Sequence, residues 1–200
     1  MKKLVEKVLI LLFCIFLLNC DNEDEIENEK VAIGCDETSS NFKQLYSNLA
    51  STASYQDITT MDLETHSYSF EVLTNKTICK IGYQSLPNFN STPYLIEIYD
   101  NTTSTMLYSG SHLFDFVNTS YINLSPIQLL IGHSYTIKRI QTNWNGDIAN
   151  TIGRLLDNNG TGAINFPIVY GDLKITGSSF YGAGGPGDNI YLPYIDIVFQ

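Results

Sequence analysis

Residues 66–83 read HSYSFEVLTNKTICKIGY, and this stretch decides the fold. Apolar and polar side chains alternate from Tyr68 to Val72, and a second apolar run extends from Ile78 to Tyr83. Alternation with a period of two places successive side chains on opposite faces of a β-strand. Asn75 lies between the two runs and favours a turn. The stretch therefore predicts either a hairpin or two successive strands.

Further strands are predicted along the chain by apolar runs between polar turns. They are Tyr94 to Tyr99, Thr105 to Tyr108, Tyr121 to Leu124, Ile164 to Tyr170, Leu173 to Ile175 and Tyr194 to Phe199. The polar residues 100–104 favour a hairpin loop between the first two. Because the sequence has no long helical pattern and no internal repeat, about eight strands predict an all-β domain.

A predicted turn and the strand that follows it indicate which kind of all-β fold to expect. Residues 129–137 read LLIGHSYTI, with Gly132 three residues before Tyr135. This spacing is typical of the tyrosine corner of Greek-key sandwiches, in which the tyrosine hydroxyl bonds back to nearby backbone. We therefore expect an all-β Greek-key sandwich, immunoglobulin-like or jelly-roll-like, over residues 66–200.

Residues 36–65 precede this expected sandwich as an N-terminal extension. Phe42, Leu45 and Leu49 recur at helical spacing behind Ser40 and Asn41, residue types that cap helices. The extension is therefore expected to contain one short helix.

Residues 1–19 have the layout of a secretory signal peptide. Three lysines precede an apolar run from Val8 to Leu18, which is shorter than the roughly 20 apolar residues that a membrane-spanning helix needs. Residues 17–20, LLNC, resemble the lipobox of bacterial lipoproteins. That resemblance implies cleavage before Cys20 and attachment of lipid to its thiol.

Residues 20–35 are predicted to be an acidic tether. Residues 21–29 read DNEDEIENE, which is too charged to bury an apolar surface. A flexible tether of this length has a root-mean-square reach of about 20 Å. The acidic run also resembles the export signal of some surface-exposed lipoproteins; the alternative is a plain spacer. We expect a protein anchored to the outer membrane by lipid on Cys20 and facing outward.

Two cysteines lie outside the signal and the anchor. If Cys35 and Cys79 pair in the oxidising envelope, the disulfide closes a loop worth about 4 kcal/mol in the chain-entropy model. The alternative is that Cys79, which alternates with Thr77 and Ile81, is a buried free thiol. The sequence leaves both open.

Charge and motifs exclude several classes of function. The formal net charge of -10 makes nucleic acid and anionic lipid poor partners. His66, His112 and His133 have no neighbours at metal-ligand spacing, and no serine sits in G-x-S-x-G. The glycine-rich residues 182–187 lack the Lys-Ser/Thr ending of a phosphate loop. We expect no catalytic residue, no metal and no cofactor.

The only tryptophan lies among hydrogen-bonding side chains in residues 141–147, QTNWNGD. An indole can stack on a sugar ring while amides and carboxylates bind its hydroxyls, so this loop and a second one near residue 181 are expected to form two walls of a saccharide site. The alternative is that Trp144 plugs one end of the sandwich. The expected ligand-binding residues are Asn143, Trp144, Asn145, Asp147, Tyr181, Asp188 and Asn189.

The chain from His66 to Phe199 resembles the DUF4082-type β-sandwich family of extracellular modules. The matching pieces are the strand Tyr94 to Tyr99 followed by Met106, Leu107 and Tyr108, the corner Gly132 to Tyr135, and the closing run Tyr194 to Phe199. The resemblance implies a surface-associated accessory or carbohydrate-binding role and fixes no ligand.

The function expected from these patterns is a non-catalytic binding or accessory module that takes a glycan. The alternative is a structural or adhesion subunit that binds another envelope protein. An exposed Trp144 beside unpaired polar groups favours the first, whereas a buried Trp144 with an apolar surface patch elsewhere favours the second.

Overall fold

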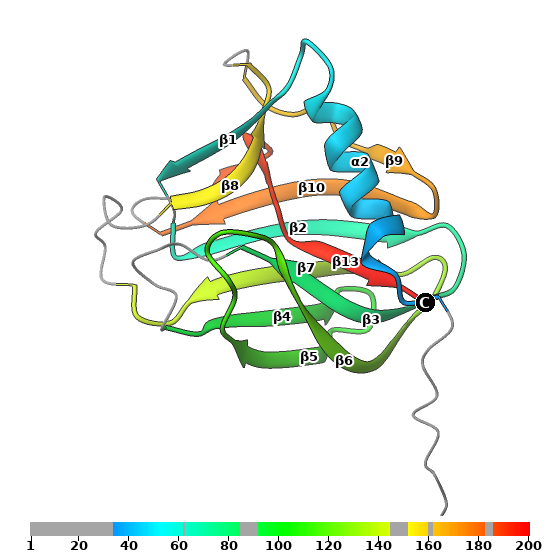
Figure 1. The fold of residues 1–200 in the computed structure, drawn as a ribbon. Helices are drawn as coiled ribbons and strands as arrows, with labels where there is room; N and C mark the ends of the chain where they lie inside the picture. Colours follow the sequence, from blue (N-terminus) through cyan, green and yellow to red (C-terminus); the bar gives the residue numbers. More distant parts are fainter. Residues whose placement is uncertain (1–33, 62, 85–91, 145–151, 160–161, 183–185) are drawn as a thin grey trace, which may run out of the picture. The chain divides into compact units, whose positions relative to one another are not determined.

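The computed structural model describes residues 34–61, 63–84, 92–144, 152–159, 162–182 and 186–200. They belong to one compact unit that runs from Gly34 to Gln200 (Figure 1). The predicted signal, Cys20 and most of the predicted tether lie outside the described residues. No helix within the described ranges combines the length and hydropathy that crossing a membrane requires.

The compact unit is built mainly of β-strands, which confirms the predicted all-β sandwich. In chain order its elements are η1 (Glu37–Ser39), α2 (Asn41–Ala50), β1 (Gln56–Met61), β2 (Thr65–Val72), β3 (Lys76–Tyr83), β4 (Tyr94–Asp100), β5 (Thr105–His112), β6 (Ser120–Leu129), β7 (Ser134–Gln141), β8 (Ile152–Asp157), β9 (Ile168–Tyr170), β10 (Leu173–Tyr181), β11 (Gly187–Asp188), β12 (Tyr191–Pro193) and β13 (Asp196–Phe199).

Antiparallel pairing joins these strands into a large sheet and two small ones. The large sheet has the order β11-β10-β2-β7-β4-β5, with β9 also paired to β10. A second sheet has the order β13-β3-β6, and a third the order β1-β8-β12. One apolar cluster takes side chains from all three, including Phe70 and Ile137 of the large sheet, Ile81 and Ile197 of the second, and Leu156 of the third.

The two strands of residues 66–83 follow one another without forming a hairpin. β2 pairs with β7 and β10, whereas β3 pairs with β6 and β13. The chain therefore crosses from one sheet to the other at the turn near Asn75. The crossing lets both strands bury an apolar face in the same core, with Phe70 and Ile78 fully buried.

The predicted hairpin between β4 and β5 is confirmed. Asp100 pairs with Thr105 at the closed end of the hairpin. The carboxylate of Asp100 accepts hydrogen bonds from the backbone N–H groups of Thr102 and Thr103, at 2.9 and 3.2 Å. This local bonding satisfies the backbone of the tight loop, as aspartate does in many turns.

The predicted tyrosine corner is also present. The hydroxyl of Tyr135 accepts a hydrogen bond from the backbone N–H of Leu130 at 2.7 Å and lies 3.3 Å from its carbonyl oxygen. Gly132 adopts a φ of 84°, which favours glycine, inside the turn. The ring of Tyr135 is buried, so the corner fixes the turn between β6 and β7 against the core.

The predicted short helix is α2, and it covers part of the core. The side chain of Ser40 caps the helix by accepting a hydrogen bond from the backbone N–H of Lys43. Phe42 and Tyr46 are buried, and the Phe42 ring stacks on that of Tyr68 with 5.2 Å between centroids. The helix therefore belongs to the same compact unit as the sandwich.

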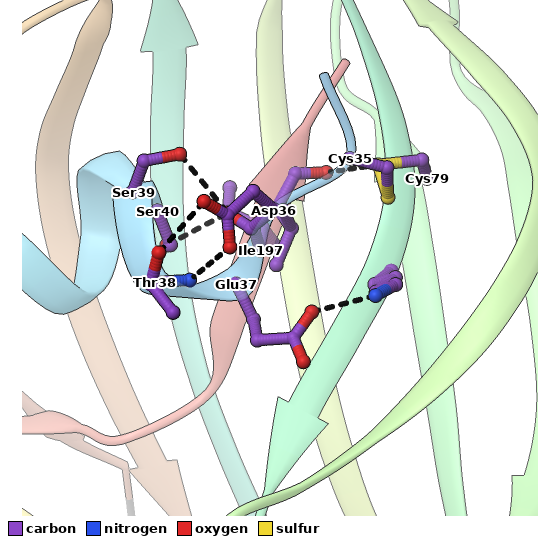
Figure 2. Close-up of a disulfide and its surroundings, with 10 residues drawn as sticks. Cys35, Asp36, Glu37, Thr38, Ser39, Ser40, Cys79 and Ile197 are labelled. Atoms are coloured by element: carbon purple, nitrogen blue, oxygen red, sulfur yellow. Dashed lines mark hydrogen bonds and ion pairs between the residues drawn. A yellow bond between two sulfur atoms is a disulfide. The ribbon is translucent and has the colours of Figure 1, made fainter. Parts of the chain in front are cut away.

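A disulfide joins the start of the described chain to β3. Figure 2 shows Cys35 bonded to Cys79, with 6.1 Å between their Cα atoms. Next to Cys79 in β3, the amine of Lys80 donates a hydrogen bond to the carboxylate of Glu37 at 2.6 Å. Cys79 is therefore part of a disulfide and is not a free thiol. The disulfide attaches the N-terminal segment to a core strand.

Some elements differ from the sequence prediction. The sequences of β1 and β8 show no clear alternation of apolar and polar residues, yet both are strands. They pair with each other from Gln56 opposite Asp157 to Met61 opposite Ile152. The predicted strand from Ile164 to Tyr170 is wrong in its first half, because only Ile168–Tyr170 is a strand. Pro167 precedes it and has no N–H to donate to a ladder. The predicted strand Leu173 to Ile175 is the start of a longer one, β10.

Candidate ligand-binding groove

The face of the large sheet that points away from the core is rich in hydroxyl groups. In β2, Tyr68 and Phe70 are buried in the core, so Ser67 and Ser69 lie on the other face. Neighbouring strands continue this surface, because Ser69 pairs with Thr136 of β7 and Ser67 pairs with Ser179 of β10. The alternation that builds the core therefore also builds a polar outer face.

A groove of about 460 Å³ lies on this outer face. Its lining consists of Ser67, Ser69, Ser134, Thr176, Gly177, Ser178, Ser179, Asp188 and Asn189. Ligand pockets have volumes of roughly 300 to 1,000 Å³, so the groove is large enough for a small molecule or a few sugar rings. Two of the predicted ligand-binding residues, Asp188 and Asn189, are in this lining.

Hydrogen bonds among the hydroxyl groups fix the floor of the groove. The Ser67 hydroxyl donates to the carbonyl oxygen of Ser179 at 3.0 Å, and the hydroxyls of Ser69 and Thr136 lie 3.1 Å apart. A serine or threonine hydroxyl has one donor and two acceptor sites. The hydroxyls of Ser67 and Ser69 therefore keep hydrogen-bonding capacity for a ligand, whereas that of Thr136 is also bonded to the Asn101 amide.

Asn189 shapes one wall of the groove. It adopts a φ of 60°, a left-handed conformation that asparagine tolerates better than most residues. Its side-chain oxygen accepts a hydrogen bond from the backbone N–H of Ser178 at 3.0 Å, and its own N–H donates to the Ser178 carbonyl. The bonds fall beside a register irregularity in β10, between Ile175 and Gly177. Asn189 therefore acts mainly as a scaffold.

Asp188 and Tyr181 are the side chains best placed to contact a ligand. The carboxylate of Asp188 is exposed and has no hydrogen-bond or ion-pair partner within the described part of the chain. Tyr181 is 53% exposed, and it follows Ser179 by two residues in β10. Residues two apart in a strand share a face, so the Tyr181 ring lies at the end of the hydroxyl-rich surface.

Trp144 does not line the groove. A methyl group added at Gly182 would come within 3.2 Å of the Trp144 ring, so the loop after β7 does lie beside the end of β10 as predicted. The ring is half-buried, however, and its Nε1 is buried and has no hydrogen-bond partner among the described residues. The arrangement fits a packing role at the end of the sandwich. Asn143 is exposed nearby, and Asn145 and Asp147 lie outside the described residues.

The core beside Trp144 is polar, which the sequence analysis missed. Arg139 is fully buried; its guanidinium donates to the carbonyl oxygen of Leu63 at 3.1 Å and lies over the rings of Tyr83 and Tyr94. His66 is buried in the same region and accepts a hydrogen bond from the Leu63 N–H. The signal was present, because Arg139 occupies an inward position in the alternation of β7.

His133 and Asp196 lie outside the lining of the groove, whereas Lys138 is the cross-strand partner of Ser67 on the outer face. His133 contacts Asp100 at 2.8 Å beside the β4–β5 loop. The pKa of Asp196 is raised, because the effect of burial exceeds the opposite effect of the hydrogen bonds that its carboxylate accepts from the hydroxyls of Ser40 and Tyr121. Asp196 belongs to β13, in the second sheet.

Chemically, the groove is suited to binding. Asp188 is the single carboxylate among its lining residues, whereas general acid–base hydrolysis of a glycoside uses a pair. Among the described residues, no group of three or more His, Cys, Asp or Glu side chains is arranged to hold a metal ion.

No known protein family matches this chain, and no curated protein matches it in sequence. The resemblance to the DUF4082-type family therefore stays a prediction. The function of this chain is therefore inferred from its sequence, its fold and the groove alone.

Proposed function

We propose that this protein is a non-catalytic binding module, held at the outer membrane by lipid on Cys20, and that its groove binds a saccharide. The observation that carries the proposal is the row of hydroxyl groups beside the exposed Tyr181 ring and the exposed Asp188 carboxylate. Sugars present hydroxyls that exchange hydrogen bonds with such a surface and a C–H face that packs on an aromatic ring.

The charge of the groove supports an uncharged ligand over an anionic one. No lysine, arginine or histidine is among its lining residues, and Asp188 adds a negative charge. Lys138 is the cross-strand partner of Ser67 but lies outside the lining, and Glu97 is its neighbour on β4. Within the lining, Asp188 would repel a phosphate or carboxylate ligand. A neutral polyhydroxylated ligand avoids this repulsion.

The membrane anchor is supported by the lipobox-like residues 17–20 and by the acidic run behind them. The disulfide between Cys35 and Cys79 adds to this support, because oxidised cysteines are typical of proteins outside the cytoplasm. Outward display follows from the acidic run if it acts as an export signal.

The test is a glycan-array screen of the mature protein, followed by calorimetry on the ligands found. Tyr181→Ala is expected to weaken binding about fivefold, because stacking on an aromatic ring contributes about 1 kcal/mol. Met106→Ala on β5 removes an apolar side chain of similar exposure, 45%, three strands from β2, and is the control. Equal affinity of both variants for every glycan found would contradict the saccharide assignment.

A second candidate function, docking of another envelope protein, is favoured by the packing of Trp144 and by one loop. Residues 113–117 expose Leu113, Phe116 and Val117, and the amide of Gln84 donates to the carbonyl oxygens of the last two. A fixed loop that exposes three apolar side chains is typical of a protein contact. Phe116→Ser with Val117→Ser would abolish chemical cross-linking to a partner on cells if this loop docks it, and leave cross-linking unchanged if it does not.

A further inference from the structure

Three exposed apolar side chains gather at one end of the sandwich. Leu73 is 42% exposed, Leu130 47% and Ile131 59%. The turns that carry them touch, because the backbone N–H of Ile131 donates to the side-chain oxygen of Asn75 at 2.8 Å. In Figure 1 these are the turns between β2 and β3 and between β6 and β7. We call these three residues the apolar tip.

The described chain begins at the same end. Gly34 lies next to Gln200, whose backbone N–H donates to the carbonyl oxygen of Thr77 at 2.8 Å. Thr77 is the second residue of β3 and follows the β2–β3 turn closely. The disulfide from Cys35 to Cys79 fixes this attachment point. The segment that leads back to Cys20 is therefore joined to the unit beside the apolar tip.

The charges around the tip are already paired. Lys76 contacts Asp172 at 2.6 Å, and Lys174 contacts Glu71 at 3.0 Å. Neither lysine is an unpaired cation that would attract anionic lipid head groups. Contact between this end and a membrane would therefore depend on apolar burial and would respond little to salt.

From these observations we propose that the apolar tip rests on the surface of the membrane that carries the lipid anchor. The inference depends on the lipidation of Cys20 proposed above. A tether with a reach of about 20 Å holds the tip near the bilayer at an effective concentration in the millimolar range. A contact too weak to recruit an untethered protein is then sufficient to orient a tethered one.

The orientation has a consequence for the rest of the molecule. β3 and β6 pair with Lys76 opposite Leu129 at the tip and Tyr83 opposite Ser120 at the far end. Eight residues of strand separate these ends by about 23 Å at 3.3 Å per residue. The loop that contains Val117 precedes Ser120, so it would face away from the membrane, as would Trp144 at the end of β7.

A tryptophan reporter at each end tests the proposal on the full lipidated chain. Trp144→Phe removes the only native tryptophan, and Ile131→Trp or Val117→Trp then adds one at the tip or at the far loop. Each variant is placed in phosphatidylcholine vesicles whose acyl chains carry bromine, a quencher of tryptophan emission. We expect the Ile131→Trp variant to lose most of its emission at low and high salt, and the Val117→Trp variant to lose little.

Equal quenching of the two reporters, or none in either, overturns the proposal. Vesicle flotation separates this result from failure of the anchor: a chain that floats but is not quenched contradicts only the tip, whereas a chain that does not float contradicts lipidation. In the absence of lipid, emission that changes with protein concentration in the Ile131→Trp variant and not in the Val117→Trp variant would mean that a second copy covers the tip, which also overturns the proposal.

Discussion

The two faces of the large sheet are made by the same strands and have opposite chemistry. On the inner face, Phe70 and Tyr135 are cross-strand partners and both are buried. On the outer face, one residue away in each strand, Ser69 and Thr136 are partners and stay partly exposed. Side-chain identity at alternate positions therefore buries one face in the core and leaves the other polar and open to solvent.

The inner side of the sandwich is not entirely apolar. Tyr135 and Asp196 each bring oxygen atoms into the interior, and each is hydrogen-bonded there. Burial of such a group costs free energy unless it has a partner. On the outer face, hydroxyl groups also contact water, so they can exchange that contact for a ligand at low cost.

The largest effect is expected from Phe70→Ala, which removes a fully buried ring packed against Tyr135 with 5.5 Å between centroids. Deleting a buried phenylalanine side chain costs about 3 to 5 kcal/mol of unfolding free energy. Chemical denaturation measures the change. Phe116→Ala, in an exposed loop, is the control and should cost less than about 1 kcal/mol. Similar losses in both would contradict the assignment of the inner face as the core.

Asp196 predicts a pH dependence of stability. Burial raises its pKa in the folded protein, so the folded state binds the proton more tightly than the unfolded state does. This contribution is fully present below the unfolded pKa of about 3.9 and is lost as pH rises through the raised pKa. As pH rises, the unfolding free energy of the wild type should therefore fall relative to that of Asp196→Asn, with a slope of at most about 1.4 kcal/mol per pH unit.

Denaturation curves of both proteins between about pH 4 and 8, a range that starts at the unfolded pKa, check this slope. Asp188→Asn removes an exposed carboxylate and is the control for the loss of one negative charge. A difference between wild type and Asp196→Asn that is independent of pH would mean that Asp196 keeps its ordinary pKa.

A smaller effect is expected from Tyr135→Phe, which keeps the buried ring and removes only the hydroxyl of the corner. The backbone N–H of Leu130 then loses its acceptor, which should cost about 1 kcal/mol. Tyr99→Phe on β4 removes a hydroxyl that has no protein partner among the described residues, and should be neutral. The melting temperatures of the two variants are compared by thermal unfolding. Equal values would mean that the hydrogen bond of the corner does not stabilise the protein.

The smallest effect on stability is expected from Ser69→Ala on the outer face. The change removes one partly exposed hydrogen bond to Thr136, so the unfolding free energy should change by less than about 0.5 kcal/mol. Affinity for the saccharide should fall severalfold, because a groove hydroxyl is lost. A stability loss without an affinity loss would reverse the roles assigned to the two faces.

Short-range patterns were sufficient for much of the fold. The alternation in residues 66–83 predicted two strands, Ser40 with Phe42 and Leu45 predicted the helix, and the spacing of Gly132 and Tyr135 predicted the corner. Each of these features depends on residues fewer than ten positions apart. Local sequence therefore carries the whole of the signal.

Long-range contacts decided what those patterns could not. β1 is a strand because it pairs with β8, about 95 residues later, and because Arg154 binds Asp57 through two nitrogen atoms and covers the Tyr194 ring at 4.2 Å. The choice between a disulfide and a free thiol for Cys79 depends on whether Cys35 is brought within reach, which spacing alone does not tell.

The candidate site shows the same division. Composition indicated a polar surface with aromatic residues, and Tyr181, Asp188 and Asn189 do lie at or beside the groove. Ser67 and Ser69 were missed because isolated serines in a strand carry no motif; they form a site only where pairing brings them beside β7 and β10. The sequence by itself determined which face of each strand is polar, and only the tertiary structure decided which polar faces are neighbours, because strand order depends on contacts between distant residues.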